Sequence, residues 1–191
     1  FSDTRYDEQS KEQVKHCKIY MISKGYEETI EKINILNDNM KIGFESNYVS
    51  VAKFNRLKSI FRKIIWEATS EIVEKIAAIK DNSEINSLKT AIEITDTVFT
   101  QILPELKEGA VEREIAAKIS YLFKMNGAEG DSYDPIIGSG KQGALPHATP
   151  SEKPFEKGDF VVMDFGALYN GYHADMTRTI VIGEATSRHE E

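Results

Sequence analysis

The sequence has little cysteine, no long apolar run and no excess of positive charge, and each shortage excludes a class of protein. Cys17 is the one cysteine among 191 residues, so an intrachain disulfide is excluded and a reducing compartment, the cytoplasm, is expected. No run of about 18 apolar residues occurs, so we expect no membrane-spanning helix. The first residues show neither an initiator methionine nor the pattern of a signal peptide. We therefore expect a soluble, globular chain that begins within a longer sequence.

The charge balance argues against two kinds of partner. The chain carries 24 Lys and Arg against 31 Asp and Glu, a formal net charge of -7 at pH 7. This balance gives no basic field for nucleic acid or for an anionic membrane, so a peptide or small-molecule partner is favoured. The hydrophobic fraction of 40% is enough for a core in one large domain or two small ones.

The order of the predicted elements indicates two domains. Helical spacing over residues 11–24, 26–37 and 49–61, with a short strand at 40–44, suggests part of a small α/β layer. After a polar break at 80–83, the apolar spacing predicts helices over 84–104 and 112–125. From residue 133 onward, turns at 138–140, 158–159 and 170–171 separate strand-like runs. We therefore expect domains at 1–77 and 78–191, the second of the α+β class.

A hairpin near the end of the chain is the most informative local prediction. Asn-Gly at 170–171, between two strand-like runs, is typical of a two-residue type I′ turn, because both central residues need positive φ. Such a turn places Tyr169 opposite Tyr172. Counting back along both strands then places Asp164 opposite Thr177.

In this register the carboxylates of Asp164 and Asp175 point to the same face, since side chains alternate with a period of two. They are diagonal neighbours, whose Cα atoms lie roughly 7–8 Å apart, so both can approach one or two divalent cations. The other face is apolar and belongs in a core. A solvated hairpin face is the alternative interpretation, because half-exposed antiparallel hairpins are common. The carboxylate face also holds Thr177, Thr179 and His173.

A histidine upstream of the hairpin lies in a restricted loop. His147 follows Pro146, and Pro150 ends the same short segment. Proline fixes φ and restricts the residue before it, so this loop is suited to present an imidazole. A lone loop histidine is also often an ordinary surface residue, and that interpretation stays open on this observation alone.

Several motifs occur in a fixed order within residues 78–183: Gly138-x-Gly140, Ala144-Leu145-Pro146-His147, Gly158-Asp159, Met163-Asp164-Phe165-Gly166-Ala167 and Gly171-Tyr172-x-x-Asp175-Met176-Thr177-Arg178-Thr179. This set resembles the pita-bread metallopeptidases of family M24, specifically the Xaa-Pro aminopeptidase and prolidase branch. The resemblance implies a pita-bread fold for the second domain. Asp3-Thr4-Arg5-Tyr6 and the helix after it are similar to the end portion of the creatinase-like N-terminal α/β domain of that branch.

The resemblance also implies roles for individual residues. Asp164 and Asp175 are expected to ligate metal, and His147 is expected to contact the substrate near the scissile carbonyl. Thr177 is placed to hydrogen-bond the ligand Asp164. Two divalent cations are implied, with Mn²⁺ first and Co²⁺ or Zn²⁺ as alternatives, and a bridging hydroxide would attack the peptide bond. The implied substrate is a peptide with proline in second position, and a homodimer is the family expectation.

The chain departs from the family pattern in three respects. Gln142 stands where many members have Asn, and His173 lies at a variable position and is not expected to ligate. Family sites use five protein ligands, and the remaining histidine and two glutamates come from strands well downstream. His-Glu-Glu at 189–191 has the right residue types, but consecutive residues cannot supply separated strand ligands, and we expect them to begin a helix with Ser187 as a possible N-cap.

We therefore expect an internal fragment that carries about half of the catalytic domain. With two of five ligands, such a fragment is expected to bind metal weakly and to hydrolyse no peptide. The alternative function is that of a non-hydrolytic pita-bread module that binds peptides or proteins, because one fold can serve several functions.

Overall fold

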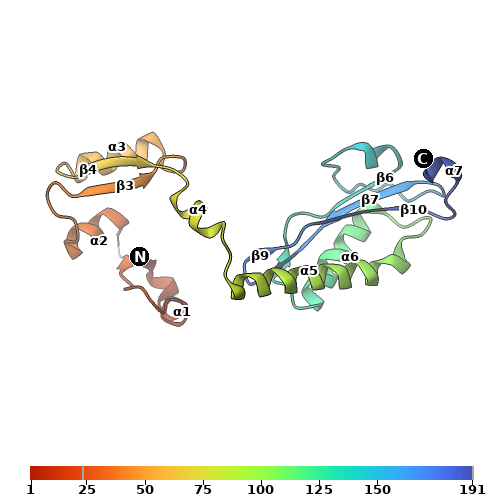
Figure 1. Cartoon of the computed structure of the whole chain (residues 1–191), viewed down its shortest axis with the longest axis horizontal. Coiled ribbons are helices and arrows are strands. Elements are labelled where there is room, and N and C mark those ends of the chain that lie inside the picture. Colours follow the sequence, from red (N-terminus) through yellow and green to blue (C-terminus); the bar gives the residue numbers. More distant parts are fainter. Residues whose placement is uncertain (23, 191) are drawn as a thin grey trace. The chain divides into compact units, whose positions relative to one another are not determined.

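The computed structural model describes residues 1–22 and 24–190, and Ser23 and Glu191 lie outside these ranges. The chain divides into two compact units, Phe1–Ile79 and Lys80–Glu191, each with its own helices and paired strands (Figure 1). Within the described ranges, no helix combines the length and the apolar character needed to cross a membrane.

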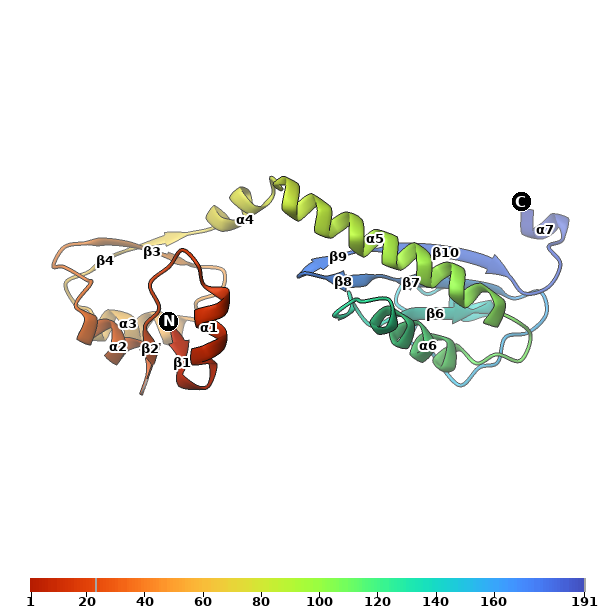
Figure 2. The ribbon, with the colours of Figure 1, turned by 90° about the horizontal axis from the view of Figure 1, so that it is seen from below.

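In its described residues, the first unit contains two parallel strand pairs, each with a helix between its strands in sequence. Its elements are β1 (Ser2–Asp3), η1 (Thr4–Tyr6), α1 (Asp7–Gln13), β2 (Met21–Ile22), α2 (Tyr26–Ile33), β3 (Lys41–Glu45), α3 (Val51–Ile60), β4 (Ile65–Thr69) and α4 (Ile72–Ala77) (Figure 2). β3 and β4 pair in parallel. Phe54 of α3 stacks on Phe44 of β3 at a ring-centroid distance of 4.3 Å and meets Trp66 of β4 edge-on at 6.2 Å. These aromatic contacts fix α3 onto the strand pair.

The helix predicted over residues 11–24 is wrong. α1 ends at Gln13, and Val14 already has extended backbone angles. Met21 and Ile22 instead pair in parallel with β1. Pairing with a strand that is distant in sequence therefore overrides the local helical spacing. The predictions for 26–37, 40–44 and 49–61 correspond to α2, β3 and α3, although α2 ends early because Asn34 takes a left-handed conformation with φ 47°.

The second unit begins with the two predicted helices, α5 (Asn82–Ile102) and α6 (Glu112–Met125), which are separated by the short η2 (Leu103–Glu105). The Asp81 carboxylate accepts hydrogen bonds from the backbone N–H groups of Ser83 and Glu84, and the Glu84 carboxylate accepts one from the Asp81 N–H. This capping box explains why α5 begins at the polar break. Both predicted helices are thus confirmed.

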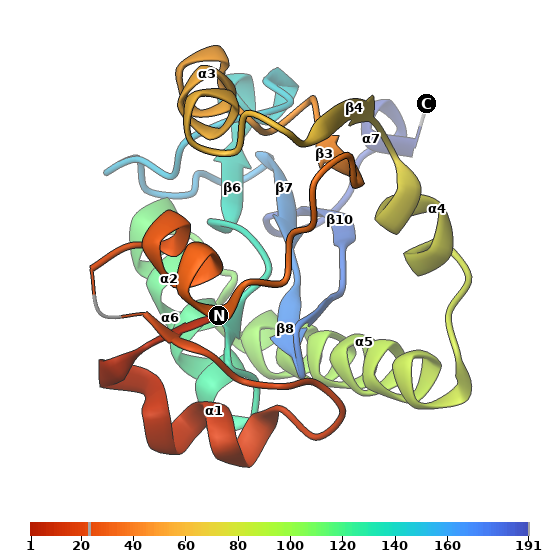
Figure 3. The ribbon, with the colours of Figure 1, turned by 90° about the vertical axis from the view of Figure 1, so that its left-hand side faces the viewer.

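Two antiparallel sheets follow the helices, so the α+β class expected for this part of the chain is confirmed. One sheet has the order β10 (Met176–Val181), β7 (Phe160–Phe165), β6 (Ile136–Ser139), and these strands lie side by side in Figure 3. The other has the order β5 (Gly130–Asp131), β8 (Ala167–Tyr169), β9 (Tyr172–His173). The turn expected at 138–140 is misplaced, because β6 continues through Ser139 and a 3₁₀ turn, η3 (Gly140–Ala144), follows it.

The end of the described chain forms α7 (Ser187–Glu190), which agrees with the predicted helix start. Ser187 is the first helical residue and does not occupy the N-cap position before it. The Thr186 N–H lies 3.0 Å from His189 Nδ1 and donates to it. His189 therefore contributes to a local helix turn in this structure.

α5 and α6 share the core of the second unit with the apolar face of the hairpin (Figures 1 and 2). On that face, Val161, Met163 and Phe165 have no exposed surface. They pack with a core cluster that includes Val98, Ile102, Ile115, Ile119, Phe123, Ile137, Ala167 and Met176. The prediction that this face of the hairpin is buried is confirmed, and burial of one face fixes the register of the strands.

The predicted hairpin register is also confirmed. Tyr169 pairs with Tyr172 and Asp164 pairs with Thr177. The turn residues Asn170 and Gly171 both have positive φ, at 49° and 77°, as a type I′ turn requires. Asp164 is therefore held in the central strand of its sheet, because β7 pairs with β6 on its other side.

The hairpin is interrupted midway, where the two sheets divide. The N–H of Ala167 donates to the side-chain oxygen of Thr95 on α5, and the carbonyl of Gly166 accepts from the N–H of Ser132. The Ala174 N–H still donates to the Ala167 carbonyl at 3.0 Å. The pairing register is therefore the same on both sides of the interruption.

Candidate functional site

Asp164 and Asp175 converge on one phenol group. The hydroxyl of Tyr133 lies 2.5 Å from Asp164 Oδ1 and 2.9 Å from Asp175 Oδ1. Tyr133 lies in the segment between β5 and β6, so a third part of the chain reaches the two aspartates of the hairpin. Asp164 is half-buried, whereas Asp175 is exposed.

Burial and the two carboxylates together keep the phenol of Tyr133 protonated. Burial of the ring, followed by the hydrogen bonds to Asp164 and Asp175, raises the pKa of Tyr133 well above its ordinary value. A phenol has a single O–H proton to donate, so it cannot serve both carboxylates with a full hydrogen bond at once. Among the described residues, the pair therefore has more acceptor capacity than its one donor, the Tyr133 hydroxyl, can satisfy.

This donor set suits a hard divalent cation. Carboxylate oxygens are preferred ligands of Mn²⁺, Mg²⁺ and Ca²⁺, and here two of them face a common point. Among the described residues, however, no group of three or more His, Cys, Asp or Glu side chains is placed to hold a metal ion. Asp164 and Asp175 thus fit a metal as part of a larger ligand set.

A cavity of about 290 Å³ adjoins Asp164. Thr177, on the neighbouring strand, contributes to its wall together with apolar side chains. The lining residues are Ile136, Gly138, Gly143, Ala144, Leu145, Pro146, Ala148, Val162, Asp164 and Thr177. A small apolar group could therefore lie beside a carboxylate, an arrangement typical of small-molecule and peptide sites.

The remaining predicted residues lie around this cavity in different ways. His147 is exposed, and its neighbours Pro146 and Ala148 line the cavity. No hydrogen bond or ion pair within the described ranges joins His147 to Asp164 or Asp175. Within the described part of the chain, Tyr133 donates to Asp164, and no hydrogen bond joins Thr177 to that carboxylate.

Two side chains that the sequence did not single out prove important here. Tyr133 lies at the start of the predicted strand region, and nothing in its local pattern predicts that its hydroxyl reaches Asp164 and Asp175. Glu112 begins a predicted helix, yet it is fully buried. Its position as an acidic residue at a helix start favours a role at the helix N-terminus, but not complete burial. Contacts between distant segments decide both environments.

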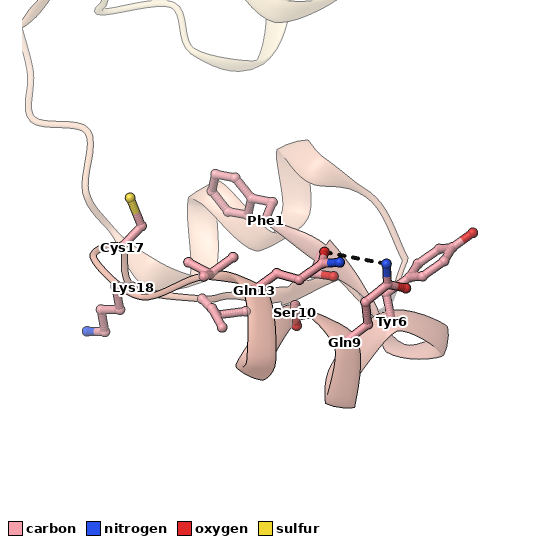
Figure 4. A pocket seen from close by; sticks show the side chains of 10 residues that line it. Phe1, Tyr6, Gln9, Ser10, Gln13, Cys17 and Lys18 are labelled. Atoms are coloured by element: carbon pink, nitrogen blue, oxygen red, sulfur yellow. Dashed lines mark hydrogen bonds between the residues drawn. The ribbon is translucent and has the colours of Figure 1, made fainter. Parts of the chain in front are cut away.

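A second hollow, in the first unit, lacks comparable chemistry. It has a volume of about 390 Å³ and is lined by Phe1, Ser2, Tyr6, Gln9, Ser10, Gln13, Val14, Cys17, Lys18 and Ile19 (Figure 4). The amide of Gln9 donates to Gln13 along one wall at 3.4 Å. The lining includes no carboxylate and no imidazole, so this hollow lacks the oxygen ligands that the carboxylate pair offers to a hard cation.

Comparison with known proteins agrees with the geometry. Residues 86–191 match the model of Metallopeptidase family M24, and residues 1–79 match that of the Creatinase/Prolidase N-terminal domain. The Xaa-Pro dipeptidase of Pyrococcus furiosus is 41% identical over 165 residues, which are 84% of this chain and 46% of that relative. An uncharacterized peptidase of Bacillus subtilis is 34% identical over 194 residues, and the match covers 100% of this chain and 54% of the relative.

Solved structures show the same likeness. An Xaa-Pro dipeptidase from Bacillus anthracis matches with a TM-score of 0.87 at 35% identity, covering 99% of this chain and 53% of its own. The X-Pro aminopeptidase from Thermotoga maritima matches with a TM-score of 0.86 at 34% identity, covering 98% and 53%. The helices and sheets are those of the pita-bread peptidases, as the motif resemblance implied.

The chain belongs to Metallopeptidase family M24. It spans about half the length of the curated relatives it matches.

Proposed function

We propose that the protein to which these residues belong is a metal-dependent exopeptidase that releases an N-terminal residue preceding proline. The observation that carries the proposal is the convergence of Asp164 and Asp175 on the Tyr133 hydroxyl in a chain of family M24. The relatives named Xaa-Pro dipeptidase and X-Pro aminopeptidase support the choice of substrate.

In this proposal Asp164 and Asp175 hold divalent metal, and Tyr133 keeps their side chains turned toward each other. Bound cations supply Lewis acidity, which lowers the pKa of water and polarises a peptide carbonyl. The phenol of Tyr133 remains neutral because burial and the two carboxylates raise its pKa. It therefore acts as a donor to the carboxylates and adds no negative charge of its own.

The cavity beside Asp164 receives part of the peptide, and His147 contacts it from the adjoining loop. Pro146 lines the cavity and fixes the backbone immediately before His147. A neutral or protonated imidazole at this position donates a hydrogen bond to the carbonyl oxygen as negative charge develops on it. Thr177 adds a hydroxyl group at the edge of the same cavity.

Four further features belong to the proposal through family resemblance. They are a pair of cations, Mn²⁺ as the first choice of metal, a homodimeric assembly and a cytoplasmic location. The oxygen-only donor set of Asp164 and Asp175 agrees with Mn²⁺, which carboxylates accept readily. The single exposed Cys17 agrees with a reducing compartment.

We also propose that the 191-residue chain alone hydrolyses no peptide. Two carboxylates do not complete a coordination shell, and a catalytic site of this kind also needs a group that manages the proton. Such a chain binds metal weakly, through Asp164 and Asp175.

The second candidate function is a peptide-binding module without hydrolysis. The observation in its favour is the apolar cavity, which could hold a peptide side chain without chemistry. The two carboxylates argue against this function. Peptide binding alone does not require two like charges, Asp164 and Asp175, that share the Tyr133 hydroxyl as a donor.

The test uses the protein extended to the length of its relatives through the downstream sequence of its gene. With Mn²⁺ present, we expect hydrolysis of an Xaa-Pro dipeptide and little hydrolysis of the matched Xaa-Ala dipeptide. Asp164→Asn should lower kcat/KM by about a thousandfold, since metal assistance amounts to several kcal/mol. Binding of Xaa-Pro peptides without turnover would favour the binding module. Hydrolysis by the 191-residue chain that Asp164→Ala abolishes would overturn the proposal that this chain is inactive.

A further inference from the structure

Glu112 is a charged side chain in a place where charge is disfavoured. It is the first residue of α6, and its exposed fraction is 0%. Glutamate is almost never fully buried unless it is paired, because loss of hydration strongly disfavours an ionised carboxylate. The partners of Glu112 therefore indicate what this residue does.

Each carboxylate oxygen of Glu112 holds a different serine. Oε1 accepts from the Ser139 backbone N–H at 2.8 Å and from the Ser139 hydroxyl at 2.7 Å. Oε2 accepts from the Ser151 backbone N–H at 3.0 Å and from the Ser151 hydroxyl at 2.6 Å. Four charge-assisted hydrogen bonds thus replace the water that burial removes.

Ser139 and Ser151 are the two ends of the loop that carries His147. Ser139 is the last residue of β6, and residues 140–150 separate it from Ser151. This segment includes five of the residues that line the cavity beside Asp164: Gly143, Ala144, Leu145, Pro146 and Ala148. One buried carboxylate therefore closes the loop at its base.

The backbone around Glu112 strengthens this closure. The N–H of Glu112 donates to the Lys153 carbonyl at 3.2 Å, and the N–H of Arg113 donates to the Ser151 carbonyl at 3.1 Å. These N–H groups belong to the first turn of α6, which has no intrahelical acceptors for them. The loop end thus satisfies the helix start, and the helix start orients the loop end.

Further side chains extend the hydrogen-bond network around Glu112 and its two serines. The Lys153 ammonium donates to the Ser139 hydroxyl at 3.0 Å and also pairs with Asp159. The Gln142 amide donates to the Ser151 hydroxyl at 3.3 Å from within the loop. Burial of Glu112 opposes ionisation, but hydrogen bonds from Ser151 and Ser139 outweigh it, so the pKa of Glu112 is lowered.

We propose that Glu112 is a positioning residue that holds both ends of the 140–150 loop and so sets where His147 and the cavity wall lie. Glu112 lines no part of the cavity beside Asp164 and makes no hydrogen bond to Asp164 or Asp175, so it acts through the loop. Its importance for catalysis rests on the proposed function, whereas its hold on the loop does not.

The first test reads the loop directly in the 191-residue chain. Amide hydrogen exchange is compared in the unaltered chain, in Glu112→Gln and in the control Glu114→Gln, which removes an exposed carboxylate from the same helix turn. In Glu112→Gln at least one of the two amides, Ser139 or Ser151, should exchange about tenfold faster or more, because glutamine accepts only at its oxygen and its NH₂ group then faces the donors of the other serine. Exchange unchanged from Glu114→Gln would overturn the proposal.

Ser151→Ala is a smaller change that tests the same proposal if Glu112→Gln does not fold. It keeps Glu112 and the two bonds from Ser139 while removing one hydroxyl at the far end of the loop. Exchange should then accelerate at residue 151 and in the second half of the loop, and the Ser139 amide should stay protected. Equal acceleration at both ends, or at neither, would contradict a carboxylate that holds each end with a separate oxygen.

The second test separates positioning from the proposed function in the full-length protein. If Glu112 acts through His147, Glu112→Gln alone should lower kcat/KM about tenfold. The same substitution should lower kcat/KM little further in a protein that already carries His147→Ala. If the loss of kcat/KM in the double variant equals the product of the two single losses, the link to His147 is overturned. An inactive full-length protein whose Glu112→Gln variant still loosens the loop would refute the proposed function and leave the positioning role standing.

Discussion

Gly166 approaches Ala174 so closely that a Cβ atom on Gly166 would lie 1.8 Å from the Ala174 carbonyl oxygen. No real Cβ atom is found at such a distance, so only glycine fits at this position. The contact lies where the hairpin divides between two sheets, one residue before Asp175. The backbone that presents the second carboxylate is therefore set by the absence of a side chain on the opposite strand.

Gly166→Ala should destabilise the second unit by about 3 kcal/mol or more, because the backbone must move to admit the methyl group. Urea unfolding of the 191-residue chain measures the change. Gly130→Ala is the matched control, since a Cβ atom there meets nothing within 4 Å. A Gly166→Ala chain as stable as the Gly130→Ala chain would show that the close approach is not a constraint on the fold.

Thr95 provides a second test of the divided hairpin. Its hydroxyl oxygen accepts from the Ala167 N–H at 3.0 Å and its proton goes to the Ala91 carbonyl at 2.8 Å, with 1% of the residue exposed. Thr95→Val leaves a buried N–H without its acceptor and should reduce the free energy of unfolding by about 1–3 kcal/mol. The change is measured by urea unfolding.

Thr97→Val is the control for this prediction. Thr97 is exposed on the same helix, and its hydroxyl bonds to the Glu93 carbonyl at 2.8 Å. Both substitutions exchange threonine for valine within α5, so helix propensity changes equally. If the two variants lost the same stability, the bond between Thr95 and Ala167 would have no special role.

The sequence predicts the hairpin well because its determinants are local. The Asn170-Gly171 turn fixes the register, and the alternation of apolar residues fixes the faces. The pairing of Asp164 with Thr177 therefore follows from the short stretch of sequence that forms the turn and its two strands. Tyr133 could not be found in this way, because its contact with both aspartates depends on how β6 pairs with β7. Pairing between strands separated by a long loop leaves no periodic signal in either strand.

The same reason explains the two main errors of prediction. Residues 14–22 leave the helical conformation because Met21 pairs with Ser2. Gly138 and Ser139 belong to a strand because β7 lies beside them. The burial of Glu112 could not be predicted for the same reason. It depends on contacts with Ser139 and Ser151, which lie 27 and 39 positions away in sequence.

The carboxylate pair should bind Mn²⁺ weakly in the 191-residue chain. Paramagnetic broadening of amide signals near residues 133, 164 and 175 measures this binding, and Asp164→Asn or Asp175→Asn should each reduce it about tenfold or more, because each removes one of two charged ligands. Glu129→Gln removes an exposed carboxylate elsewhere in the second unit and should leave the broadening unchanged. Broadening that persists in both aspartate variants would place the metal elsewhere.

The lowered pKa of Glu112 predicts how stability depends on pH. Its folded-state pKa lies below the ordinary value of 4.5, so the folded state favours the ionised form. The resulting stabilisation is present above pH 4.5 and is lost as the pH falls through the folded-state value. The difference in unfolding free energy between the unaltered chain and Glu112→Gln should therefore be about 2–3 kcal/mol near pH 7 and should shrink below pH 4.5.

Urea unfolding at a series of pH values measures this difference, with Glu114→Gln as the charge control. A difference that stayed constant into acid would mean that the four hydrogen bonds do not depend on the charge of Glu112.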